Sequence, residues 1–272
     1  MPTVPATWTA DSLRERLSGT RFAAVRLFDE IDSTNRYLLD EAVTGASEGL
    51  VAVANHQTSG RGRLGRRWES QPGASLLVSV LLRPSAPPLE LPPQRLHLVT
   101  AACSMAACDA VEQVAGFRPG VKWPNDLMAD GRKLAGVLAE TRVVEAGVDA
   151  LVVGVGLNVE KEAFPPELAE IATSCGQVAG RSIDRADLLV ALLTAFDRGY
   201  TQLALPAGPA EVLREYRRAC VTVGSSVRVD FAGRSIEGVA VEIDDDGHLV
   251  VETSPGARAV VTAGDVAHLL PL

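Results

Sequence analysis

Short apolar segments recur between residues 24 and 159 and predict the strands of one sheet. Runs of this length, separated by polar or glycine-containing turns, are typical of strands that are buried in a sheet. One strand ends at Pro124, which lacks the backbone N–H that a neighbouring strand would need. The predicted strands are residues 24–31, 50–55, 74–82, 121–124, 133–141 and 148–159.

Helical spacing marks the segments that should cover this sheet. Apolar side chains recur every three or four positions in residues 94–115, which predicts a long core helix. Leu38, Leu39, Ala42 and Val43 are predicted to share the apolar face of a shorter helix. Three more helices are predicted at residues 9–18, 185–204 and 209–219, the first with Thr9 as its N-cap.

The C-terminal part of the chain is predicted to be all-β. Its turns are rich in glycine and aspartate. The acidic turn at residues 244–247 lacks the spaced ligands of a calcium loop, so it is interpreted as a hairpin turn. The predicted strands are residues 227–231, 235–243, 248–252 and 259–261. We therefore predict an α+β fold, in which residues 1–220 form a mixed β-sheet with helices packed on it and residues 221–272 form a small all-β barrel.

Composition limits the class of protein. The chain has 272 residues, of which 47% are apolar, and a formal net charge of −8. Such an acidic protein lacks the extended basic surface that general nucleic-acid binding needs. We expect neither a signal peptide at the N-terminus nor a membrane-spanning segment, and hence a cytoplasmic location. The four cysteines form no C-x-x-C pair and have no metal-ligand spacing, so no metal site is predicted.

One cationic loop contrasts with this acidic background. Residues 60–68, with the sequence GRGRLGRRW, contain four arginines and three glycines. Arginine can bind a carboxylate or phosphate through two parallel hydrogen bonds, and glycine lets the backbone approach a ligand closely. The loop therefore indicates a compact anionic ligand, although a flexible surface turn or an RNA-binding segment has a similar composition.

Four more motifs accompany the loop in a fixed order. They are DSTN at 32–35, KWPNDL at 122–127, KLAGVLAE at 133–140 and GVGLN at 154–158. Together these motifs resemble the signature of the biotin protein ligases, and the resemblance covers nearly the whole chain. It implies an enzyme that activates biotin with ATP to biotinyl-5′-AMP and then transfers biotin to a lysine of a biotin carboxyl carrier protein. It also implies the type of biotin protein ligase that has no N-terminal DNA-binding domain. Such a protein is expected to be a monomer or homodimer and to bind neither nucleic acid nor a membrane.

Several of the motif residues have an ordinary structural interpretation as well. Ser33 and Thr34 are typical helix caps, and Pro-Asn-Asp at 124–126 is a typical turn. Gln57 carries a donor and an acceptor, which match a urea-like ring. The resemblance assigns biotin contacts to Ser33, Thr34, Asn35, Gln57, Gly60, Arg61, Gly62, Arg63, Lys133 and Gly136. It assigns ATP and adenylate contacts to Arg63, Arg66, Trp68, Lys122, Asn125, Asp126, Lys133 and Asn158, with Lys133 and Arg63 as the catalytic residues.

The implied chemistry needs fixed cations rather than a nucleophile. Both steps move negative charge among carboxylate and phosphate oxygens, and cations placed at that charge supply most of the catalysis. ATP should arrive with Mg²⁺, which is held mainly by phosphate oxygens and water. Gly136, Gly154 and Gly156 lie inside predicted strands, where a glycine often marks the close approach of a ligand.

Three alternative functions remain open at this point. A lipoate–protein ligase or octanoyltransferase has a related catalytic fold, but its acyl ligand has no ureido ring. A nucleic-acid-binding module built on the cationic loop is opposed by the net charge of −8. A biotin sensor without ligase activity is opposed by Lys133 and Arg63, because a pure sensor has no α-phosphate to handle.

Overall fold

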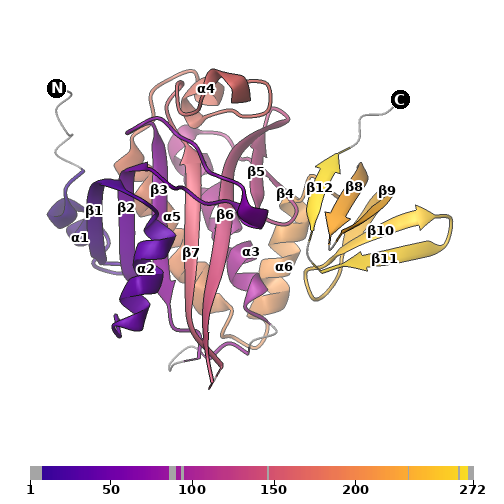
Figure 1. Cartoon of the computed structure of the whole chain (residues 1–272), viewed down its shortest axis with the longest axis horizontal. Coiled ribbons are helices and arrows are strands. Elements are labelled where there is room, and N and C mark those ends of the chain that lie inside the picture. The colour runs from indigo at the N-terminus through magenta and orange to yellow at the C-terminus, as the bar shows by residue number, and fades with distance from the viewer. Residues whose placement is uncertain are drawn as a thin grey trace.

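The larger of two sheets carries the helices and confirms the predicted mixed topology (Figure 1). A computed structural model describes residues 8–85, 90–92, 95–145, 147–231, 233–262 and 264–268. The seven-stranded sheet has the order β1-β2-β3-β7-β6-β5-β4, in which β1 and β2 are parallel and the other neighbours antiparallel. Its strands are β1 (Ala24–Ile31), β2 (Leu50–Gln57), β3 (Ser75–Leu82), β4 (Gly120–Lys122), β5 (Asp126–Ala129), β6 (Arg132–Val144) and β7 (Gly147–Asn158).

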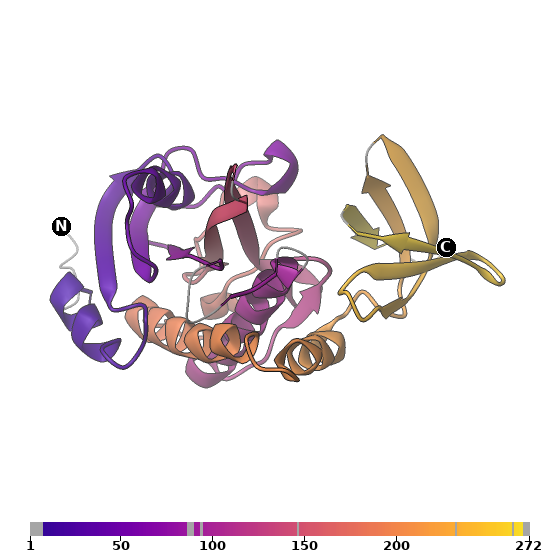
Figure 2. The ribbon, with the colours of Figure 1, turned by 90° about the horizontal axis from the view of Figure 1, so that it is seen from below.

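The helices cover the two faces of this sheet unequally. Figure 2 shows α5 and α6 along one side and α2 on the opposite side. The helices are α1 (Ala10–Arg16), α2 (Thr34–Val43), α3 (His97–Ala115), α4 (Cys175–Ala179), α5 (Arg185–Gln202) and α6 (Gly208–Ala219), with short 3-10 turns at η1 (Arg63–Gly65) and η3 (Pro166–Leu168). The predicted helix 94–115 corresponds to α3, and residue 94 lies outside the described residues. The predicted cap is confirmed, because the Thr9 side chain accepts a hydrogen bond from the backbone N–H of Ser12.

Helix α3 is the one described helix that is long and apolar enough to cross a membrane by length and composition, which the sequence analysis had not expected. It packs inside the fold, where its apolar residues share one core cluster with those of α5 and with Leu76, Val78 and Val80 of β3. Most of the helix is buried in this way. The prediction of a core helix is therefore confirmed.

A smaller core lies on the opposite face, beneath α2. Leu38 and Ala42 are buried there against Ala52, Leu81 and Val152. The prediction that Val43 belongs to this apolar face is wrong, since 64% of its surface is exposed at the last turn of the helix. The site lies at the N-terminal end of α2, where Ser33, Thr34 and Asn35 line a cleft on this sheet face.

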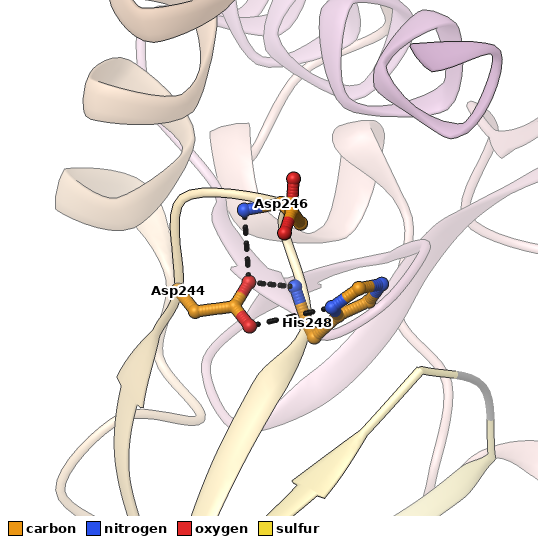
Figure 3. A group of neighbouring side chains, drawn as sticks. All are labelled: Asp244, Asp246 and His248. Carbon is orange, nitrogen blue, oxygen red and sulfur yellow. Dashed lines mark hydrogen bonds and ion pairs between the residues drawn. The ribbon is translucent and has the colours of Figure 1, made fainter. Parts of the chain in front are cut away.

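The C-terminal sheet has five antiparallel strands in the order β11-β10-β9-β8-β12. These are β8 (Ser226–Phe231), β9 (Arg234–Ile243), β10 (Leu249–Ser254), β11 (Ala257–Val261) and β12 (Asp265–His268). The predicted all-β character is confirmed, while β12 was not foreseen. At the acidic turn between β9 and β10, Asp244 Oδ1 accepts hydrogen bonds from the backbone N–H groups of Asp246 and His248, at 3.0 and 2.8 Å (Figure 3). The carboxylate closes a hairpin turn, as predicted.

The KWPNDL segment anchors the C-terminal sheet to the larger one. The indole N–H of buried Trp123 donates to the carbonyl of Gly247 at 3.0 Å, and its backbone N–H donates to the Thr222 hydroxyl at 3.0 Å. The Tyr216 hydroxyl donates to the carbonyl of Pro124 at 2.9 Å. These contacts tie the segment before β8, the β9–β10 turn and α6 to the KWPNDL motif.

Candidate functional site

A polar cleft opens on the sheet face that carries α2, where three glycines replace side chains. Gly136 of β6 pairs with Gly156 of β7, and Gly154 pairs with Ser79 of β3. A Cβ on Gly154 would lie 2.2 Å from Asn35 Oδ1, and one on Gly156 would lie 2.5 Å from the indole ring of Trp68. The two glycines in β7 therefore make room for two protein side chains. The groups that approach them closely in this structure are the side chains of Asn35 and Trp68.

A β-bulge brings Lys133 to the cleft. Strand pleating alone would point residues 133 and 136 to opposite faces of β6. The pairing with β5 shifts between Leu127 and Met128, which leaves Leu134 as the extra, fully buried residue. Lys133 and Gly136 consequently line the same cleft. There the Lys133 ammonium lies 2.7 Å from Asp126 Oδ1 and 5.8 Å from the centre of the Trp68 ring.

The inner end of the cleft is a network of neutral hydrogen-bonding groups. The backbone N–H of Thr34 donates to Gln57 Oε1 at 2.7 Å. The Thr34 hydroxyl lies 2.7 Å from the Ser79 hydroxyl, which donates to Asn35 Oδ1 at 2.6 Å. Ser33 caps α2 by accepting from the backbone N–H of Arg36. The first turn of α2 thus directs its side chains and its positive dipole end toward this part of the cleft.

Glu140 joins this network to the cationic loop. One of its carboxylate oxygens accepts from Asn35 Nδ2 at 2.8 Å, and the other accepts from Arg61 Nη1 at 3.0 Å. Glu140 is the last residue of the KLAGVLAE motif, and it lies on the same side of β6 as Gly136 and Leu138.

The cationic loop folds back on itself and contacts the C-terminal sheet. The backbone N–H of Gly62 donates to the carbonyl of Arg66 at 2.7 Å, and Leu64 at the tip has a left-handed φ of 56°. Arg63 Nη1 donates to Asn125 Oδ1 and to the carbonyl of Gly264, both at 3.2 Å. Arg66 pairs with Asp265 of β12 at 2.5 Å. The two sheets therefore share one site.

Three cations and two carboxylates form the outer end of the cleft: Arg63, Arg66, Lys133, Asp126 and Asp265. A fourth cation, Lys122, lies behind them near Asp126. Burial lowers the pKa of Arg63 and of Lys122, although Asp126 and Asp265 act in the opposite direction on both. Burial would raise the pKa of Asp265, but the hydrogen bond and charge of Arg66, with Lys122 and Arg63, hold it below its ordinary value. The excess positive charge suits a ligand with several anionic oxygens.

Comparison with known protein families covers both sheets. The profile of the Biotin/lipoate A/B protein ligase family matches residues 27–158, and that of the Biotin protein ligase C terminal domain matches residues 222–269. The chain is similar to a biotin--[acetyl-CoA-carboxylase] ligase of Mycobacterium tuberculosis, with 36% identity over 95% of this chain and 94% of that protein. The chain belongs to the biotin protein ligase family.

Two further relatives extend this comparison. The bifunctional ligase/repressor BirA of Bacillus subtilis is 34% identical over 86% of this chain and 71% of its own length. The structure of the biotin protein ligase from Aquifex aeolicus in complex with biotin and ATP matches with a TM-score of 0.76 and 27% identity, covering 89% of this chain and 97% of that one. Most of the chain thus shares its fold with a ligase of known structure.

Most of the site residues expected from the family signature meet in the cleft. The cleft is lined by Ser33, Thr34, Asn35, Gln57, Arg61, Gly62, Arg63, Arg66, Trp68, Asn125, Asp126, Lys133 and Gly136. Three expected residues do not line it. Gly60 packs against the carbonyl of Trp68, Lys122 lies behind the outer end near Asp126, and Asn158 is buried and donates to the carbonyl of Thr173 at 3.0 Å.

Sequence reasoning missed three residues of the site. Ser79 is a polar residue inside the apolar strand 75–82, and this position was itself a signal that a buried polar group has a partner. Glu140 ends the KLAGVLAE motif, but no role was predicted for it. Asp265 lies in β12, which was not predicted, so nothing in the sequence connected it to Arg66.

Proposed function

We propose that this protein is a biotin protein ligase that works in two steps at the cleft. In the first step, a carboxylate oxygen of biotin attacks the α-phosphorus of ATP, and the bond to pyrophosphate breaks. In the second, the amine of a carrier lysine attacks the acyl carbon of biotinyl-5′-AMP. The new C–N bond forms, AMP leaves with the electron pair of the C–O bond, and the amine gives up a proton. The family and its biotin- and ATP-bound structural relative support this assignment.

The observation that supports it most strongly is the division of one cleft into a neutral inner end and a cationic outer end. Biotin has the same division, because its ureido ring is neutral and its valeryl chain ends in a carboxylate. A ureido ring needs both donors and acceptors. Thr34, Asn35 and Gln57 offer both, and Thr34 N–H holds Gln57 Oε1 so that its carboxamide nitrogen remains available. We therefore propose that the ring binds at the inner end.

The carboxylate would then lie toward Lys133, Arg63 and Arg66, where charge changes during adenylation. Lys133 is fixed by Asp126 and by the β-bulge, so it can hold the carboxylate and stabilise charge on the bridging oxygen. Arg63 and Arg66 come from the loop and are suited to the α-phosphate. Trp68 and Asn125 would flank the nucleotide. Lys122 is more distant and would act through its charge.

The residues present fit Mg²⁺ that arrives with ATP better than a dedicated protein site. Asp126 and Asp265 are the carboxylates that line the cleft in the described part of the chain, and each is paired with a cation. Phosphate oxygens and water would therefore supply most ligands, and Asp126 would accept a hydrogen bond from a bound water. The ion would neutralise charge on the phosphates.

We further propose that the acceptor is a biotin carboxyl carrier protein and that the chain divides near residue 220.

The direct test is incubation with biotin, ATP and Mg²⁺, followed by mass spectrometry for biotinyl-5′-AMP. Parallel reactions contain octanoate or lipoate, because the first family profile covers lipoate ligases as well. A biotin adduct that appears on a carrier lysine only when ATP is present is the expected result. Turnover of octanoate or lipoate without any reaction of biotin would contradict the proposal.

A further inference from the structure

Glu140 occupies the point where the inner end of the cleft meets the cationic loop. Its two carboxylate oxygens contact different parts of the chain: one accepts from Asn35 at the start of α2, and the other from Arg61 in the loop. The side chain is largely buried, with 26% of it exposed. In the described part of the chain, Asn35 and Arg61 share no hydrogen bond with each other, so Glu140 is the link between them.

The carboxylate also fixes the direction of the neighbouring hydrogen bonds. A carboxylate only accepts, so the NH2 group of Asn35 must face Glu140 and its Oδ1 must face Ser79. Ser79 then donates to Asn35 at 2.6 Å and must accept from Thr34 at 2.7 Å. Thr34 has a single hydroxyl proton, so Gln57 Oε1, 3.0 Å from that hydroxyl, depends on the backbone N–H of Thr34 instead. The carboxylate, helped by the longer hydrogen bond from the same NH2 group to the carbonyl of Leu138 at 3.4 Å, thus orients the donor and acceptor pattern of the inner cleft.

We infer that Glu140 is a positioning residue that couples the biotin pocket to the cationic loop. With Glu140 in place, Arg61 stabilises the carboxylate that holds Asn35 in its binding orientation. In return, the NH2 group of Asn35 holds the same carboxylate, to which Arg61 of the loop is bound. A glutamine at this position could donate to Asn35, so that only the longer hydrogen bond to the carbonyl of Leu138 would oppose a reversal of the amide and of the pattern. The inference rests on the proposed function, since biotin is the ligand that the oriented groups would bind.

The test is a set of biotin dissociation constants, measured by calorimetry on the full chain without ATP. The variants are Arg61→Gln, Glu140→Ala and the double variant, with Glu140→Gln as a second replacement of similar size. Arg61→Gln is expected to weaken biotin binding about fivefold in the wild-type background and less than about twofold in the Glu140→Ala background. Glu140→Gln alone should also weaken binding about fivefold or more. A residue that merely stabilised the fold would not remove the effect of Arg61.

The matched control is Glu242→Ala, which breaks the exposed pair of Glu242 with Arg258 on the C-terminal sheet and should leave biotin affinity unchanged. If Arg61→Gln weakens binding equally with and without Glu140, Arg61 contacts biotin directly and the coupling is wrong. If Glu140→Ala does not fold, Glu140→Gln with and without Arg61→Gln completes the same cycle. A folded wild-type protein that does not bind biotin would overturn the proposed function together with this inference, whereas normal binding without coupling overturns the inference alone.

Discussion

The indole ring of Trp68 lies directly over the α-carbon of Gly156, so a Cβ at residue 156 would come within 2.5 Å of the ring. A second glycine fixes the backbone of Trp68, since the backbone N–H of Trp68 donates to the carbonyl of Gly60 at 3.0 Å. A Cβ on Gly60 would meet the carbonyl oxygen of Trp68 at 2.5 Å. The two glycines therefore determine where the ring faces the cleft.

Replacing Gly156 with alanine should displace Trp68 and impair ligation. The ring cannot stay where it is, because real Cβ contacts are never as short as the one that the added methyl would make. We expect carrier biotinylation to fall at least about tenfold, with a stability loss of about 1–3 kcal/mol from overpacking. Steady-state biotinylation and urea unfolding measure the two effects. Gly199→Ala is the control, because its Cβ would lie 3.5 Å from Ala102 and fits; equal activity of the two variants would contradict the prediction.

Hydrophobic patterning predicted the long strands and helices because each has enough apolar residues to reveal its period. The strand predicted at 24–31 matches β1, and the helix predicted at 209–219 matches α6 within one residue. The short strands β5 and β12 were missed. Each has four residues and begins with an aspartate, so it resembles a turn, and only pairing with a distant strand stabilises it.

The motifs predicted which residues would meet, but not how they are held. Lys133 was expected in the site, whereas the bulge that turns it toward the cleft depends on its pairing with β5. Asn158 is the last residue of the glycine-containing strand β7, so the motif alone placed it with the ligand. In the fold its carboxamide is buried beneath the segment that carries Thr173. Long-range partners of this kind leave no local pattern in a sequence.

Replacing Asp265 with asparagine should loosen the cationic loop without unfolding the protein. The pair with Arg66 is about half exposed on both sides, so its loss should cost less than about 1 kcal/mol of stability. Arg66 would lose its charged anchor on β12, and trypsin should cleave the loop at its arginines several-fold faster. Cleavage is followed by mass spectrometry on ligand-free protein. Asp230→Asn, which disrupts the pair with Arg228 on the same sheet, should cleave at the wild-type rate. Unchanged cleavage in Asp265→Asn would show that the pair does not restrain the loop.

His268 should make stability depend on pH in the mildly acidic range. Burial and the charge of Lys122 lower its pKa below the ordinary value of 6.5. Between that lowered pKa and 6.5 the unfolded chain binds more protons than the folded one, so stability falls as the pH falls through this window. The slope stays below the limit of about 1.4 kcal/mol per pH unit, because the ring is partly exposed. Urea unfolding of His268→Gln from about pH 7.5 to about pH 5.5 should give a shallower slope than wild type; an identical slope would rule out this contribution.

Lys133 and Arg63 should fail in different ways when each is replaced by alanine. Lys133 belongs to a strand and is held by Asp126 at 2.7 Å, so it is suited to positioning the biotin carboxylate. Arg63 comes from the loop and is held to Asn125 and to the C-terminal sheet by two longer hydrogen bonds, so it is suited to closing over the finished adenylate. Lys133→Ala should therefore slow adenylation itself, by at least the loss of about 1.5–3 kcal/mol for a charge-assisted contact.

Arg63→Ala should still form the adenylate but release or hydrolyse more of it before transfer. Pyrophosphate release and carrier biotinylation are measured separately for each variant, and their ratio decides the matter. The ratio should rise above the wild-type value in Arg63→Ala, while in Lys133→Ala both rates fall together. Arg36→Ala and Lys161→Ala, which remove exposed cations outside the cleft, control for the general loss of positive charge. If both cleft variants keep the wild-type ratio, the two cations share one role, and the difference in how they are held has no catalytic consequence.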